Sequence, residues 1–148
     1  MKSLKAKKVN MTQIFDESGE VFPVTLVVLD KSKETEPQEI SLKSGDIVAV
    51  SGISKGKGFQ GVVKRHKFGG GRRSHGQKHS EREVGSVGGG GRAGGRIVKG
   101  MRMAGRMGGE KITVKNLKII KVLPETNEIF IGGAVPGKRG SAIEIKSK

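Results

Sequence analysis

The sequence lacks cysteine, tryptophan and tyrosine, so its five phenylalanines supply every large aromatic ring. Without cysteine there is no disulfide framework and no thiolate metal site, which fits a reducing compartment. No apolar run comes near the roughly 18 residues that a membrane-spanning helix needs. The N-terminal segment MKSLKAKKVNMTQIF also lacks the apolar core of a signal peptide. These absences argue against disulfide-stabilised scaffolds and helical membrane proteins.

Acidic residues are also scarce, because 14 Asp and Glu face 29 Lys and Arg, for a net charge of +15 over 148 residues. The excess is concentrated between residues 54 and 109, which contain 14 Lys and Arg, two Glu and 18 of the 25 glycines. A charge this unbalanced indicates a polyanionic partner. The sequence therefore predicts a nearly neutral body, residues 1–53 with 110–148, interrupted by a basic glycine-rich insert, residues 54–109.

The body is rich in β-branched residues and shows short strand patterns separated by turn signals. No window of a dozen residues has helical periodicity. We expect a mainly β fold, a small antiparallel barrel. The predicted strands lie within residues 20–30, 41–53, 111–123, 128–137 and 141–148, and a brief strand is expected at 39–42 inside the polar connection 29–45.

The insert has too few apolar residues to offset the ordering of its own backbone, which costs on the order of 1–2 kcal/mol per residue. Glycine increases that cost. Composition therefore predicts that the insert is disordered in isolation and becomes ordered on a negatively charged surface. There, glycine would let the backbone approach closely while Arg and Lys neutralise phosphates.

The segment GISKGKGFQG, residues 52–61, superficially resembles a phosphate-binding loop. A Walker A loop ends in Gly-Lys followed by Ser or Thr, whereas Gly58 follows Lys57 here. The spacing back to Gly52 is one residue short, and no helix is expected after the segment. We interpret it as a basic turn that leaves the barrel, with Lys55 and Lys57 facing phosphates.

All three histidines, His66, His75 and His79, lie in the insert. His75 and His79 are four residues apart, a spacing that could place both on one metal if the segment were helical. Gly76 and the lack of an amphipathic pattern argue against that helix. Imidazoles that stack on RNA or hydrogen-bond to it are the favoured interpretation, and metal ligation is the alternative.

Catalytic residues cannot be identified in this sequence. The serines lie in turn signals, and no nucleophile–base pair is evident. Glu81 and Glu83 flank Arg82, which predicts local charge pairing and not general acid–base chemistry. We expect no enzyme activity and no cofactor.

The segment RIVKGMRMAGRMGG, residues 96–109, spaces four cations three to four residues apart and interleaves them with three methionines. We favour a basic segment held by methionine packing while its cations meet phosphates. A solvated charged strip is the alternative. A disordered Arg-Gly-rich tract also competes, but such tracts repeat a short unit and this insert is irregular.

Several long motifs together resemble the bacterial type of the third protein of the large ribosomal subunit. They occur in collinear order over most of the chain: KKVNMTQIFDESGEVFPVTLV, GDIVAVSGISKGKGFQGVVKRHKFGGG, SHG, GSVG, KGMRMAGRMGGEKITVKNLKIIKV and GGAVPGKRGS.

The resemblance implies a translation-protein-type β-barrel with a long basic extension that enters large-subunit ribosomal RNA (rRNA) toward the peptidyl transferase centre. It also implies a structural role in the large subunit, in early assembly and beside neighbouring ribosomal proteins, on a cytoplasmic ribosome or alternatively an organellar one. A free-standing RNA chaperone is the alternative function. The residues expected to contact RNA are Lys7, Lys8, Lys55, Lys57, Lys64, Arg65, His66, Lys67, Arg72, Arg73, His75, Lys78, His79, Arg82, Arg92, Arg96, Lys99, Arg102 and Arg106.

The chain also departs from the family pattern. Members of the family are longer by several dozen residues, so we expect a trimmed barrel, with the missing material between PVTLVVLD and GDIVAV. Asn10 replaces a usual glycine, and we expect it to keep a turn there because Asn tolerates positive φ. Residues 88–91 are four glycines where many members carry a methylated Gln, which excludes that modification at this place.

Overall fold

The computed structural model describes residues 3–30, 42–88 and 94–147, which form two compact units. Unit 1 comprises Met1–Lys55 with Gly109–Lys148, and unit 2 comprises Gly56–Gly108. The elements in chain order are β1 (Ser3–Phe15), β2 (Val21–Leu29), β3 (Ile47–Ile53), β4 (Phe59–Gln60), α1 (Val62–His66), a 3-10 helix (Ser80–Arg82), β5 (Gly105–Arg106), β6 (Lys111–Leu123), β7 (Glu128–Gly132) and β8 (Ala142–Ser147).

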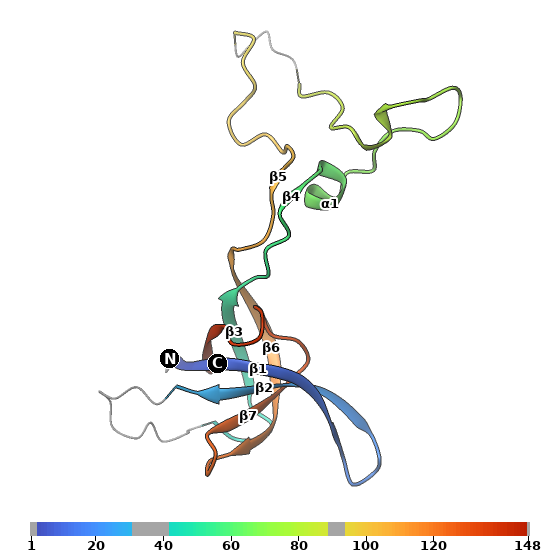
Figure 1. Ribbon diagram of the computed structural model, residues 1–148. Coiled ribbons are helices and arrows are strands. Elements are labelled where there is room, and N and C mark those ends of the chain that lie inside the picture. The colour runs from blue at the N-terminus through green and yellow to red at the C-terminus, as the bar shows by residue number, and fades with distance from the viewer. Residues whose placement is uncertain (1–2, 31–41, 89–93, 148) are drawn as a thin grey trace. The chain divides into compact units, whose positions relative to one another are not determined.

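Unit 1 is a closed barrel of six strands in the order β1-β2-β7-β6-β3-β8 (Figure 1). All six pairings are antiparallel, including β1 with β8, which completes the closure. Closure leaves no free edge along the paired part of the sheet. The predicted small antiparallel barrel is confirmed. The extended loop expected for residues 54–109 stays a prediction.

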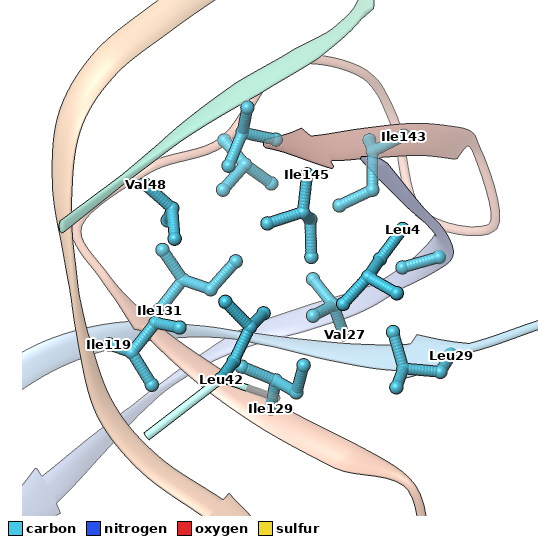
Figure 2. Packing of buried hydrophobic residues seen from close by; sticks show 13 residues of the cluster. Leu4, Val27, Leu29, Leu42, Val48, Ile119, Ile129, Ile131, Ile143 and Ile145 are labelled. Atoms are coloured by element: carbon cyan, nitrogen blue, oxygen red, sulfur yellow. The ribbon is translucent and has the colours of Figure 1, made fainter. Parts of the chain in front are cut away.

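The barrel core follows the period-two alternation of its strands. In β1, Leu4 and Ala6 are buried while their neighbours in sequence face outward. Figure 2 shows the side chains of Ile143 and Ile145, as predicted for β8, among the apolar residues that fill the barrel. Each such side chain contributes about 1.5–3 kcal/mol through burial. The core residues are Leu4, Ala6, Val27, Leu29, Leu42, Val48, Val50, Ile119, Ile129, Ile131, Val135, Ile143 and Ile145.

Bulges explain why the apolar alternation in β6 is imperfect. The pairing of β3 with β6 shifts register between Val48 and Val50, which face Leu117 and Val114. One extra β6 residue is accommodated there, and Asn116 adopts the left-handed conformation with φ of 59°. The bulge returns Leu117 and then Ile119 to the inner side.

Strand β1 differs from what the sequence predicts, and the segment 39–42 is described only at Leu42. Residues 3–15 form one strand, and the register shift between Lys8 and Asn10 is a bulge. The predicted positive-φ turn at Asn10 is therefore wrong, because the additional residue is absorbed within β1. The strand expected at 39–42 lies outside the described residues except for Leu42, which is buried in the core.

Candidate nucleic-acid interface

The base of unit 2 is a short two-stranded stem. Strand β4 pairs with β5 through Phe59 with Arg106 and Gln60 with Gly105. Two backbone bonds extend the stem: Lys57 N–H donates to Met107 O, and Met107 N–H donates to Gly58 O, both at 2.9 Å. The glycine-rich ends of the insert are thus tied together across some fifty residues of sequence.

The one-turn helix α1 follows the stem, with Val62 buried on one side and Lys67 ending it in the left-handed conformation. No helix was expected after residues 52–61, so that expectation is wrong. The segment is still not a Walker A loop, because Gly58 stands where such a loop has Ser or Thr after Gly-Lys. A helix this short is below the length that periodicity can reveal.

Arg65 and His66 converge on one carbonyl oxygen. Arg65 Nη1 donates to Met103 O at 2.8 Å, and His66 Nε2 donates to the same oxygen at 3.0 Å. The His66 ring also lies 5.9 Å from the ring of Phe68, in a tilted arrangement. Both residues were predicted to contact RNA, and both are half-buried. The structure gives each of them a role in holding the Met103 backbone near α1.

A second feature of unit 2 is a loop closed by tight backbone contact. Gly71 N–H donates to Glu81 O at 2.9 Å. A Cβ on Gly70 would lie 2.2 Å from Glu81 O, and one on Gly71 would lie 2.7 Å from Ser80 O. Only glycine lets the two chain segments approach this closely. The loop between them presents Arg72, Arg73, His75, Lys78 and His79, all exposed.

Within this loop Arg73 forms an ion pair with Glu81. The expected local pairing of Glu81 is thus present, but with Arg73 and not with its sequence neighbour Arg82. Both side chains are largely exposed, so the pair adds little stability. Among the residues that the structure describes, no three His, Asp or Glu side chains gather where they could hold a metal ion.

Most of the predicted RNA-contacting residues are exposed. Of these, Lys7 and Lys55 lie in unit 1. In unit 2 the exposed ones are Lys57, Lys64, Lys67, Arg72, Arg73, His75, Lys78, His79, Arg82, Arg96, Lys99, Arg102 and Arg106. Arg92 lies outside the described residues. Such exposed cations can meet phosphates at little cost in desolvation, since they stay hydrated until a partner arrives.

Lys8, unlike these residues, is buried. It follows Leu4 and Ala6 on the inward side of β1, and only 7% of it is exposed. Its Nζ donates to Val135 O at 2.9 Å and to Gly137 O at 3.1 Å. Burial, and after it the positive charge of Lys55, lowers the pKa of Lys8 below its ordinary value of 10.5. In this structure Lys8 therefore fastens the segment after β7 to β1, and its contact with RNA stays a prediction.

The methionines pack less than expected. Met103 and Met107 are half-buried, but Met101 is 38% exposed.

Two exposed cations in the segment between β7 and β8, Lys138 and Arg139, were not among the predicted RNA-contacting residues. Arg139 Nε donates to Val9 O at 3.3 Å. Counting charge over the whole body concealed them, although adjacent cations in PGKRGS were a local signal.

Comparison with known proteins identifies the family. A family model described as "Ribosomal protein L3" matches residues 1–129. "Large ribosomal subunit protein uL3" of Chlorobium limicola is 58% identical over 107 residues, 72% of this chain and 51% of that protein. Its namesake in Chlorobaculum tepidum is 56% identical over 113 residues, 76% of this chain and 53% of that protein. The chain belongs to the ribosomal protein L3 family.

The chain spans about half the length of these two relatives. The protein of the same name in Streptococcus pyogenes serotype M1 is 38% identical over 205 residues, 99% of this chain and 96% of that protein. Because this chain has 148 residues, several dozen positions of the streptococcal protein have no counterpart here. The expectation of an unusually short family member is confirmed.

Proposed function

We propose that this protein is a structural constituent of the large ribosomal subunit and binds its rRNA chiefly through the exposed cations of unit 2. The single observation that carries the proposal is the loop between Gly70 and Glu81. It displays five exposed basic or imidazole side chains on a backbone held by contacts that only glycine permits. Phosphate contacts by such side chains supply most of the affinity of proteins for nucleic acids.

The barrel and unit 2 have different parts in this proposal. The barrel has an apolar core of its own and serves as the folded anchor. Unit 2 has one fully buried apolar side chain among its described residues, Val62, so RNA would supply the packing that it lacks. This division supports insertion of unit 2 between RNA helices. We further propose, from the family resemblance, that the insertion points toward the peptidyl transferase centre and occurs early in assembly.

Fractionation tests the role. The full chain, carrying an affinity tag, is expressed in a bacterial host and large subunits are isolated through a moderate-salt wash. We expect the chain to remain with the large subunit in about one copy. Crosslinks from His75 and Arg96 should map to rRNA positions buried in the subunit. A chain that washes off and binds RNA non-selectively would identify an RNA chaperone and contradict the proposal.

A further inference from the structure

The connected ends of β1 and β2 form an arm that extends past the barrel. We define the arm as Asn10–Phe15, the turn 16–20 and Val21–Pro23. Strand β1 pairs with β8 only through Ser3–Lys7, and β2 pairs with β7 only from Val24 onward. Within the described part of the chain, the arm therefore has no strand on either outer edge. Figure 1 shows it in blue, projecting from the barrel strands of unit 1.

One face of the arm carries three exposed apolar side chains, Met11, Phe15 and Val21, with the polar Gln13 among them. The register pairs Gln13 with Pro23 and Phe15 with Val21, and Met11 lies on the same face two residues before Gln13. Met11 is 50% exposed, Phe15 63% and Val21 51%. Met11, Gln13, Val21 and Pro23 also line a shallow groove. Exposed apolar side chains gathered on one face favour an interaction site, because leaving them in water is unfavourable.

The charge of the arm argues against RNA as its occupant. Residues 9–30 contain no Lys or Arg, the longest such run in a chain that has 29 of them, and they include four acidic residues. Three of these, Asp16, Glu17 and Glu20, are exposed at the tip. A phosphate backbone would meet like charge there. A second copy would bring acidic tip to acidic tip, which is also unfavourable.

We propose that the apolar face and acidic tip of the arm dock a neighbouring basic protein in the assembled large subunit. Such a partner offers Lys and Arg to the tip and apolar side chains to Met11, Phe15 and Val21. Charge at the rim would then set orientation while apolar burial provides affinity. This assignment rests on the proposed function.

A photocrosslinker tests the docking. Phe15 of the full chain is replaced by p-benzoylphenylalanine, and large subunits containing the variant are purified and irradiated. We expect an adduct that survives ribonuclease and is destroyed by protease, with a peptide from a basic ribosomal protein attached. The matched control places the same group at Phe59, which is 76% exposed in unit 2, where the adduct should be sensitive to ribonuclease.

A second variant measures the contribution of the apolar face. The double substitution F15S/V21S should weaken retention of the crosslinked neighbour through a salt wash roughly tenfold. It should leave the affinity of the chain for free large-subunit rRNA unchanged. The control I112S removes an exposed apolar side chain of β6, outside the arm, and should not affect the neighbour.

The outcomes separate the two proposals. In subunits that contain the chain, an RNA adduct at Phe15, an adduct to a second copy, or no adduct would overturn the docking proposal alone. A chain that never enters the large subunit would overturn both the proposed function and the docking that rests on it. Retention of the neighbour by F15S/V21S would likewise contradict the role of the apolar face.

Discussion

At the scale of single residues, Gly105 leaves the space that Arg65 occupies. A Cβ at position 105 would lie 2.6 Å from Arg65 Nη1, so the guanidinium would have to move away from Met103 O. We expect Gly105→Ala to lower the free energy of local opening of the β4–β5 stem by about 1 kcal/mol, which is about a fivefold increase in the open population. Hydrogen exchange of the Met107 amide in assembled subunits should accelerate accordingly.

The matched control for Gly105→Ala is Gly61→Ala. Gly61 has φ of −69° and no atom within 4 Å of its would-be Cβ, so alanine fits there. Arg65→Ala should reproduce the effect of Gly105→Ala, and the double variant should add little, because both changes break the same bond. Additive effects of the two changes would show that the Arg65 contact is not what Gly105 protects.

Lys8 gives a second prediction at this scale. Lys8→Met leaves the carbonyl oxygens of Val135 and Gly137 without their donor, so the barrel should lose about 1–3 kcal/mol of unfolding free energy at pH 7. Urea unfolding measures this loss. Lys7→Met, at the exposed neighbouring position, is the control and should change stability little. Equal effects at both positions would rule out the anchoring role of Lys8.

The pH dependence of this difference has a definite sign. Folding lowers the pKa of Lys8, so the unfolded chain binds more protons in the window just below 10.5. The contribution of Lys8 to the unfolding free energy therefore rises as pH rises through that window. Subtracting the curve of Lys8→Met from that of the natural protein should isolate the rise. A difference that falls with pH contradicts the assigned burial.

At the scale of elements, the loop from Gly70 to Glu81 depends on backbone contact. Gly70→Ala would place Cβ 2.2 Å from Glu81 O at a residue with φ of 78°, a strain of about 1–3 kcal/mol. The loop should open, and affinity for large-subunit rRNA should fall about five- to 150-fold in a filter-binding assay. Gly69→Ala meets no atom within 4 Å and should bind normally. Equal rRNA affinities of Gly70→Ala and Gly69→Ala would contradict a contribution of this loop to rRNA binding.

The strands show what the sequence could predict and why. Apolar alternation identified β8, and β-branched runs identified β2 and β3, because burial on one face requires that pattern. Strand β1 was not predicted, because its inward-facing residues include Lys8. A lysine in a sequence indicates a surface cation, and only the structure shows the two carbonyl oxygens that accept from Lys8 inside the fold. The one-turn α1 is too short for any periodic signal.

The candidate site was only partly predictable for a related reason. Counting charge located the basic segment, but it could not separate exposed cations such as Arg72 from internal donors such as Arg65. That distinction depends on which carbonyl lies within reach after folding. The apolar face of the arm depends likewise on register, because Phe15 and Val21 become neighbours only through the turn that joins β1 and β2.

At the scale of the whole molecule, a nearly neutral barrel carries a basic unit whose affinity for rRNA should come from phosphate neutralisation. If about six cations of unit 2 each meet a phosphate, the logarithm of affinity should fall with the logarithm of salt concentration at a slope of about four to five. The slope counts contacts, whereas a single affinity does not.

The measurement that tests this claim most directly is the salt dependence of rRNA binding by the natural chain and by the triple variant Arg72→Gln, Arg73→Gln, Lys78→Gln. We expect the slope to decrease by about two to three units in the variant. Neutralising three exposed barrel lysines, Lys5, Lys43 and Lys121, should leave it nearly unchanged. A slope near zero for the natural chain, or an equal decrease in both variants, would contradict the assignment of rRNA binding to unit 2.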